Sequence, residues 1–233
     1  MNDTELLGDL HRMLTDRGAA IVAVADLQSL PPDVRDDLPR AVCIGVALDP
    51  AIVSGIADGP TLVYADEYQR ANDHLNRLAA ACAELLGERG FRIGGSRVAS
   101  GALNKETLAT TLPHKTVATR AGVGWIGKCA LLINETYGSA VRYNSVLTDA
   151  PLPAGVPIED CRCGECSACV ERCPVGASSG HPWKPTLQRS DFFDAFACCQ
   201  GAQSQCRKIG IDHTICGICI AACPYTRRYL ARE

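Results

Sequence analysis

The sequence predicts a mixed α/β (α+β) domain over residues 1–155, followed by a smaller cysteine-rich domain over residues 156–233. Three observations support this division. Apolar runs typical of buried strands are mixed with helical patterns along the first part of the chain. Prolines and glycines then gather between Pro151 and Pro157, as in a linker. Eleven of the 14 cysteines lie between Cys161 and Cys223, so the second part is organised around cysteine.

The elements of the first domain are predicted from periodicity. Leucines recur at helical spacing from Leu6 to Leu14, so residues 3–17 are expected to form a helix that stops at Gly18. The remaining elements are expected as strands at 19–25, 41–48, 130–133 and 139–147, and as helices at 62–86 and 113–121. The last two strands are joined at 134–138.

Composition excludes several classes of protein. Hydrophobic residues make up 47% and charged residues 21%, with a net charge of −3, which is typical of a globular domain and does not favour a DNA-coating surface. The N-terminus is acidic where a signal peptide would be basic, and no apolar run is long enough to span a bilayer. We therefore expect a cytoplasmic protein without a membrane segment, in which clustered cysteines bind metal rather than form disulfides.

Two cysteine motifs predict a pair of iron-sulfur clusters. The first has the spacing C-x2-C-x2-C-x3-C-P and ends at Pro174; the second has the spacing C-x2-C-x3-C-P and ends at Pro224. This is the run of bacterial two-cluster ferredoxins, in which the fourth cysteine of a run ligates the other cluster. Zinc knuckles also use C-x2-C pairs, but two C-P endings are unusual for them. Crossed ligation assigns cluster I to Cys163, Cys166, Cys169 and Cys223, and cluster II to Cys173, Cys216, Cys219 and one further ligand.

The further ligand departs from the symmetrical pattern. A symmetrical ferredoxin has a cysteine three positions before Cys216, where this chain has His213. Cys198 is the expected ligand because thiolates are the commoner choice; Cys199, Cys206 and His213 are the alternatives. Cys161 is expected to be a spare, and Cys129 a buried apolar thiol.

A second motif lies in the first domain. Residues 120–128 read Arg-Ala-Gly-Val-Gly-Trp-Ile-Gly-Lys, and this segment resembles a signature of the epoxyqueuosine reductase family. The likeness covers roughly residues 110–225 and continues through 131–134, 137–139 and 147–152. It implies a nitroreductase-like corrinoid-type domain, shared with reductive dehalogenases, followed by a ferredoxin-like domain with two [4Fe-4S] clusters. Members of the family reduce an epoxide on a modified tRNA base.

The resemblance also implies a cobalamin site. Glycines would let the backbone approach a large flat cofactor, the indole would offer an apolar face, and the cations would meet amide or phosphate groups. The residues expected to bind it are Arg120, Gly122, Gly124, Trp125, Gly127, Lys128 and Arg142. The alternative is a glycine-rich turn with Trp125 in the core and solvated cations around it. Strand alternation places Arg142 and Tyr143 on opposite faces, so that one of them would face the pocket.

One departure from the family concerns the proton donor. The family's catalytic aspartate precedes the Arg-Ala-Gly motif, yet residues 108–111 here read Leu-Ala-Thr-Thr. Opening an epoxide needs a proton donor, so His114 and Tyr143 are the expected catalytic residues, with Tyr137 as an alternative. The acidic net charge favours a small-molecule substrate over tRNA.

These observations predict an iron-sulfur oxidoreductase that receives electrons from a redox partner protein and passes them to a cobalamin. Two alternatives stay open at this point. One is an electron-transfer protein without bound corrinoid, which the missing aspartate favours. The other is a reductase of the same fold that binds flavin.

Overall fold

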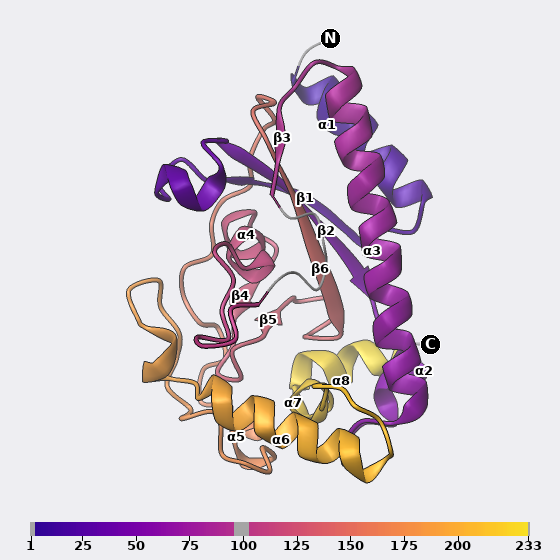
Figure 1. Cartoon of the computed structure of the whole chain (residues 1–233), viewed down its shortest axis with the longest axis vertical. Coiled ribbons are helices and arrows are strands. Elements are labelled where there is room, and N and C mark those ends of the chain that lie inside the picture. Colours follow the sequence, from indigo (N-terminus) through magenta and orange to yellow (C-terminus); the bar gives the residue numbers. More distant parts are fainter. Residues whose placement is uncertain (1–2, 96–102, 233) are drawn as a thin grey trace. The chain divides into compact units, whose positions relative to one another are not determined.

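The computed structural model describes residues 3–95 and 103–232. Helices and strands alternate in mixed order (Figure 1), which confirms the predicted α/β class. The elements are α1 (Asp3–Asp16), β1 (Ile21–Asp26), a 3-10 helix (Pro32–Arg35), β2 (Arg40–Ala47), α2 (Pro50–Ser54), α3 (Leu62–Glu88), β3 (Ile93–Gly94), α4 (His114–Arg120), β4 (Trp125–Ile126), β5 (Leu132–Ile133), β6 (Val141–Thr148), α5 (Ala168–Glu171), a second 3-10 helix (Arg189–Asp191), α6 (Ala195–Lys208), α7 (Ile218–Ala222) and α8 (Pro224–Leu230).

The chain divides into two compact units, each built from three segments. Unit 1 comprises residues 1–47, 71–123 and 142–158, and unit 2 comprises residues 48–70, 124–141 and 159–233. The chain leaves unit 1 for the last time after Ile158, close to the linker expected from the prolines. Two earlier segments, 48–70 and 124–141, also pack in unit 2 with the cysteines.

Unit 1 is built on a four-stranded sheet in the order β1-β2-β6-β3. Strands β1 and β2 pair antiparallel with Ile21 opposite Gly45, and β3 pairs antiparallel with β6. Because side chains alternate along β6, its two faces meet different helices. Arg142 Nε donates to Asn72 Oδ1 of α3 at 3.0 Å on one face. Ser145 contacts the start of α4 on the other face, so α3 and α4 cover opposite sides of the sheet.

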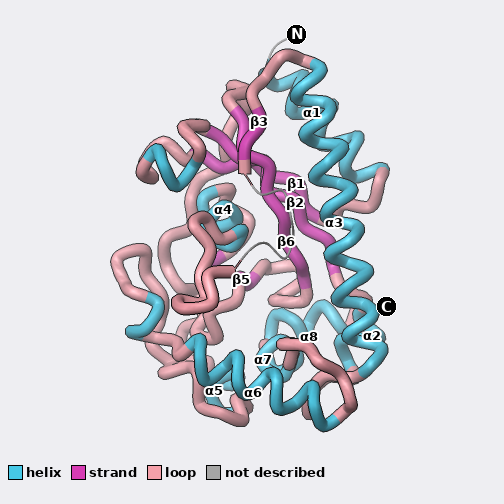
Figure 2. Tube along the Cα trace, viewed as in Figure 1, coloured by secondary structure: helices cyan, strands magenta, loops and turns pink. Residues whose placement is uncertain are grey.

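Unit 2 consists largely of loops and helices (Figure 2), and its β4 and β5 form a two-stranded sheet. The strands expected at 130–133 and 139–147 exist as β5 and β6, but they do not pair with each other: β5 pairs with β4, and β6 belongs to the sheet of unit 1. The turn after β5 is held against α8. Gly138 adopts a φ of +60°, and a Cβ atom there would lie 2.2 Å from the amide nitrogen of Thr226.

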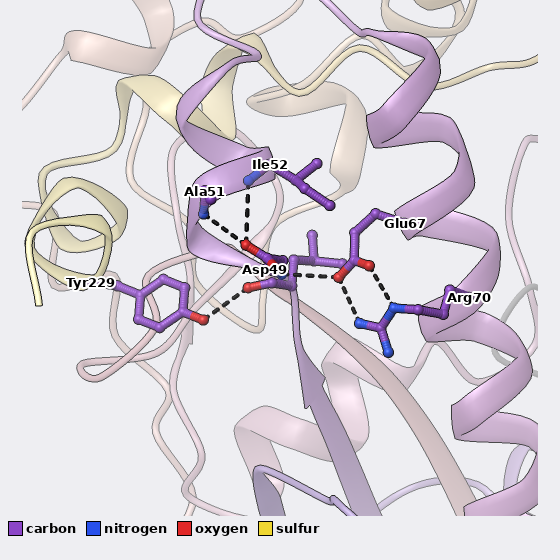
Figure 3. A network of polar contacts seen from close by, with 7 residues as sticks. Asp49, Ala51, Ile52, Glu67, Arg70 and Tyr229 are labelled. Atoms are coloured by element: carbon purple, nitrogen blue, oxygen red, sulfur yellow. Dashed lines mark hydrogen bonds and ion pairs between the residues drawn. The ribbon is translucent and has the colours of Figure 1, made fainter. Parts of the chain in front are cut away.

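A network of hydrogen bonds and an ion pair links residues of the segment 48–70 to one another and to α8 within unit 2 (Figure 3). The Asp49 carboxylate caps α2 by accepting from the amide of Ala51 at 2.8 Å. Glu67, which is buried, accepts from the Asp49 amide at 2.9 Å and from the Arg70 guanidinium at 2.6 and 2.7 Å. The Tyr229 hydroxyl of α8 donates to the carbonyl of Leu48 at 2.8 Å. This network joins the C-terminal helix to the segment.

No helix within the described residues is long and apolar enough to cross a membrane.

Candidate metal centre

The cysteines of unit 2 are present as thiols. No disulfide joins any of the 14 cysteines, all of which lie in the described part of the chain. Cys43 and Cys82, in unit 1, are buried, and burial raises the pKa of each to about 12, which suits the inert buried thiols expected there.

The surroundings of Cys163 lower its pKa and so favour its thiolate form. A hydrogen bond from the Cys161 thiol lowers the pKa of Cys163 to about 5 against the effect of burial, and the Trp125 N–H and the Lys128 ammonium lower it further. The Trp125 Nε1 atom lies 3.5 Å from the Cys163 Sγ atom. Since the thiolate is the form that binds metal, this environment favours a ligand. Cys161, expected to be a spare, therefore supports Cys163 as a hydrogen-bond donor.

Two further thiols, Cys169 and Cys223, lie close enough to Cys163 for its negative charge to raise their pKa. Burial raises the pKa of Cys223, and the negative charge of Cys163 raises it further. A hydrogen bond with Cys129, burial, and the charges of Cys129 and Cys163 raise the pKa of Cys169. Cys163, Cys169 and Cys223 thus form a first group of thiols, although more than 50 residues separate Cys169 from Cys223 in the sequence.

A second group forms around Cys173. Burial raises the pKa of Cys198 to about 11, and the charges of Cys173 and Cys216 raise it further. Burial likewise raises the pKa of Cys216, with a contribution from Cys173. The Cys173 Sγ atom accepts a hydrogen bond from the amide of Ala177 at 3.3 Å.

The alternatives for the further ligand are engaged elsewhere. The Cys206 thiol is buried and donates to the carbonyl of Ile215 at 3.1 Å. The His213 ring packs edge-on against Tyr68, with ring centroids 5.4 Å apart, and its Nδ1 atom accepts from the amide of the next residue. Cys199 follows Cys198 directly in α6.

The donor set fits iron-sulfur clusters. Among the described residues, no three histidine, cysteine, aspartate or glutamate side chains converge to hold a single metal ion. A four-iron cube takes one thiolate on each iron, so its ligands stand apart instead of converging on one point. The thiol-rich donor set and the grouping of Cys163 with Cys223, and of Cys173 with Cys198, suit such cubes.

The two glycines of the β4-β5 hairpin are required by close approach of the chain. A Cβ atom on Gly124 would lie 2.1 Å from the carbonyl oxygen of Ile133, and one on Gly127 would lie 2.8 Å from the Ile133 side chain. The second Cβ would also lie 3.5 Å from the Cys163 Sγ atom. Both glycines, expected to face a cofactor, therefore let the hairpin close beside a cysteine.

Trp125 and Lys128, also expected at the cofactor, are buried in unit 2 beside the cysteine loop. The indole packs edge-on against Tyr225, with ring centroids 5.0 Å apart. The Lys128 ammonium donates to the carbonyls of Gly164 at 2.8 Å and Cys166 at 3.1 Å. These contacts fix the backbone of the first cysteine loop and place a positive charge beside its thiols.

The other residues expected at the cofactor lie in unit 1. The Arg120 guanidinium donates to the carbonyl of Asp26 at 2.6 Å and to the hydroxyl of Ser29. Gly122, at a φ of +72°, packs against Val156, and Arg142 contacts α3 as described above. Arg120 lines an open cleft of about 480 Å³ with Asp26, Gln28, Ser29, Ala154, Gly155, Val156 and Pro157.

The expected proton donors lie on the α4 side of the sheet. The Nδ1 atom of His114 is 2.6 Å from the hydroxyl oxygen of Ser145. Tyr143 is buried two residues before Ser145 on β6, so the two side chains share a face of the strand. Ser145 was not singled out from the sequence; its position two residues after Tyr143 is the signal that could have found it.

Comparison with known proteins gives partial sequence matches. No protein-family model matches the chain. The epoxyqueuosine reductase of Salmonella typhimurium is 35% identical over 129 residues, covering 54% of this chain and 31% of that protein. The epoxyqueuosine reductase of Listeria monocytogenes is 34% identical over 119 residues, covering 48% and 29%. The chain thus spans about a third or less of the length of these relatives.

Solved structures match nearly the whole chain. A crystal structure of epoxyqueuosine reductase with a modified tRNA stem loop superposes with a TM-score of 0.66 at 20% identity, covering 97% of this chain and 66% of that one. A catabolic reductive dehalogenase superposes with a TM-score of 0.70 at 18% identity, covering 96% and 31%. At these identities the structures establish the fold, in agreement with the corrinoid-type domain expected from the sequence.

Proposed function

We propose that this chain, a member of the epoxyqueuosine reductase-like family of iron-sulfur and corrinoid reductases, is an oxidoreductase that holds two [4Fe-4S] clusters and a cobalamin. When bound, the clusters would carry single electrons from a redox partner protein to the cobalamin, at which an organic substrate would be reduced. We propose a cofactor domain at residues 1–155 and a ferredoxin-like domain at residues 156–233, with the segments 48–70 and 124–141 of the first contributing to the compact unit that holds the cysteines.

The observation that carries this proposal is the grouping of the thiols. Cys163 lies in electrostatic range of Cys223, and Cys173 lies in range of Cys198 and Cys216. Crossed ligation requires both associations, because the last cysteine of each run serves the other cluster. We therefore assign cluster I to Cys163, Cys166, Cys169 and Cys223, and cluster II to Cys173, Cys216, Cys219 and Cys198.

The chain's own residues prepare these ligands. The Lys128 ammonium donates hydrogen bonds to two carbonyls of the first loop, so the backbone that carries the thiols is fixed without bound metal. In unit 1, we propose that His114 donates the proton that reduction of the substrate consumes, with Tyr143 beside it on the same side of the sheet. The Ser145 hydroxyl fixes the orientation of the His114 ring.

The substrate is proposed to be a small organic molecule. The carboxylate expected at 108–111 from the family is missing, and the net charge of −3 does not favour a polyanion. The homologous structure with a tRNA stem loop supports tRNA as the competing substrate class. Binding of a tRNA stem loop at physiological salt, measured by fluorescence anisotropy, would favour that class instead.

A second candidate function is electron transfer without a corrinoid. The observation that favours it is the use of Gly124, Trp125 and Gly127 in closing the β4-β5 hairpin, which leaves these residues engaged by the protein itself. The B12-dependent mechanism described for a reductive dehalogenase of the same fold favours the first candidate.

Metal analysis separates these functions. Protein purified without oxygen is reconstituted with iron, sulfide and cobalamin, and is then desalted. The proposal expects about eight irons and one cobalt per chain. About eight irons without cobalt would favour the electron carrier, and a yellow chromophore released on denaturation would indicate flavin. Four irons or fewer would refute the two-cluster assignment.

A further inference from the structure

Lys128 places a buried positive charge beside the first cysteine loop. Of the lysines and arginines in the described part of the chain, it alone is buried, at 9% exposed. Its ammonium donates to the carbonyls of Gly164 at 2.8 Å and Cys166 at 3.1 Å. Both acceptors are neutral, and none of the ion pairs among the described residues includes Lys128. Burying a charge costs free energy unless an opposite charge compensates it, so this environment suits an anion bound at the loop.

A four-iron cube held by this loop would be such an anion. Four thiolates outweigh the positive charge of the iron-sulfide core, so a ligated cube is negative, and its reduction adds a further negative charge. A nearby cation therefore stabilises the reduced state more than the oxidised state. Because Lys128 is buried, water and salt screen its charge only weakly. The ammonium thus favours reduction of a cluster on this loop.

The second group of thiols has different charges around it. Arg172 directly precedes Cys173, but its guanidinium lies 2.8 Å from the carboxylate of Asp58. The two side chains are 51% and 94% exposed, so solvent screens their charges. Asp194 caps the helix α6 that carries Cys198, and it brings a negative charge to that end of the helix. Among the described residues, the second group therefore has no counterpart of the buried ammonium.

We propose that Lys128 makes the two clusters unequal by raising the reduction potential of cluster I above that of cluster II. This inference rests on the two-cluster function proposed above. An electron shared between the two cubes would then rest on cluster I. The step is a one-electron transfer in which cluster II is oxidised and cluster I is reduced, and no bond or proton changes place. Lys128 acts through its charge and not as a ligand, because an ammonium has no lone pair to donate.

The backbone around Lys128 is held in place as well. The Ser178 hydroxyl donates to the Lys128 carbonyl. The amide of Gly127 donates to the carbonyl of Leu131 at 2.8 Å, and the Gly127 carbonyl accepts from the amide of Ala130 at 2.8 Å, which closes a tight turn around Lys128. A charge that is fixed in advance needs no rearrangement when the electron arrives, so its stabilising effect is retained in full.

Redox titrations followed by electron paramagnetic resonance on the reconstituted protein test this proposal. K128Q removes the charge and keeps an amide that can donate to a loop carbonyl, whereas K128R keeps the charge. We expect K128Q to make reduction of cluster I less favourable by about tenfold, which is a shift of 59 mV to a more negative potential for a one-electron couple. The potential of cluster II is expected to stay unchanged, and K128R is expected to stay close to the parent.

Two ligand variants assign each potential to its cluster. C198S is expected to keep cluster I alone, and C163S is expected to keep cluster II alone. Adding K128Q is then expected to shift the remaining potential in the C198S background and to leave it unchanged in the C163S background. K184Q makes the same chemical change at an exposed lysine of unit 2 and is expected to shift neither potential.

Each other outcome overturns a definite statement. A parent protein in which cluster I has the lower potential would overturn the inference, as would unchanged potentials in K128Q at full iron content. An equal shift in K128R, or a shift of cluster II, would show that the Lys128 charge does not act on cluster I alone. Loss of cluster I from K128Q would make the role structural, which also overturns it. A parent protein that takes up no more than four irons would instead refute the two-cluster function on which the inference rests.

Discussion

Glu67 is expected to stabilise unit 2 through the network of Figure 3, and E67Q tests this. Its side chain is 3% exposed, and its carboxylate accepts three hydrogen bonds. One oxygen accepts from the Asp49 amide at 2.9 Å and from Arg70 at 2.7 Å, and the other accepts from Arg70 at 2.6 Å. A glutamine supplies one acceptor oxygen, so its NH2 group would face a donor.

The magnitude follows from the contact that is lost. A hydrogen bond to a charged group contributes about 1.5–3 kcal/mol. The Arg70 side chain is 53% exposed, so solvent screens the ion pair and its own contribution is about 0–1 kcal/mol. Glutamine also avoids the cost of burying a carboxylate, which offsets part of the loss. We expect E67Q to lower the free energy of unfolding by about 2 kcal/mol.

Urea unfolding followed by tryptophan fluorescence measures this effect where it occurs. Both tryptophans of the chain, Trp125 and Trp183, lie in unit 2 together with Glu67. With an m-value of about 2 kcal/mol/M, the midpoint is expected to fall by about 1 M. E84Q makes the same chemical change at an exposed position of α3 and is expected to have no effect. A midpoint for E67Q equal to that of E84Q would refute the reasoning.

Three further changes have definite expected outcomes. C198S is expected to retain about four of eight irons by iron and sulfide analysis, and a full complement would contradict its assignment. G138A is expected to destabilise unit 2 by about 2–5 kcal/mol in urea unfolding, because alanine is strained at φ +60° and its Cβ would overlap the backbone of Thr226. The control is G210A: its Cβ would meet no atom within 4 Å, so only the backbone strain remains and a loss of about 1 kcal/mol is expected. The hydrogen bond from the Arg92 guanidinium lowers the pKa of Asp149 in the folded chain. The contribution of this ion pair to stability is therefore fully present above about pH 4, the unfolded pKa of an aspartate, and is lost as pH falls through the lowered pKa. R92Q is expected to lower stability by up to about 1 kcal/mol at pH 7, by circular dichroism, with the difference vanishing in acid; a difference that persists at pH 2 would count against this origin.

The elements of unit 1 could be predicted where their periodicity is local. The helix expected at 3–17 corresponds to α1, whose Leu6, Leu10 and Leu14 are buried. The long helix expected at 62–86 corresponds to α3. In contrast, β3 and β4 have two residues each, which is too short for any pattern, and they exist because partner strands hold them.

The division of the chain into units could not be read from composition. The segment 48–70 packs in unit 2 because of tertiary contacts, such as that of the buried Glu67 with the Asp49 amide. Neither residue belongs to a motif. The Arg172 guanidinium similarly donates to the Ala57 carbonyl at 2.9 Å, a contact between residues 115 positions apart.

The cysteine spacing predicts a cluster loop from the sequence alone, because such a loop is a local structure. Cys163, Cys166 and Cys169 are close in sequence, and the motif itself orders them. The position of Cys198 depends on how α6 packs, which spacing does not encode. Cys129 was expected to be a buried apolar thiol because burial is the usual state of a lone cysteine, and it is 6% exposed.

The loops that carry the cysteines have little regular secondary structure, so their shape depends on tethers from distant segments. The Lys128 ammonium donates hydrogen bonds to two carbonyls of the first loop. The Thr226 hydroxyl, two residues after the second Cys-Pro element, accepts from the Ser139 amide at 3.0 Å. Both tethers come from the segment 124–141, which precedes the cysteine-rich region in sequence. Because this segment also supplies the Trp125 N–H and the Lys128 ammonium beside Cys163, it both shapes the first loop and contributes to the electrostatic environment of that thiol. Within this segment Gly124, Trp125, Gly127 and Lys128 are all buried in unit 2, where Trp125 and Lys128 contact the first cysteine loop.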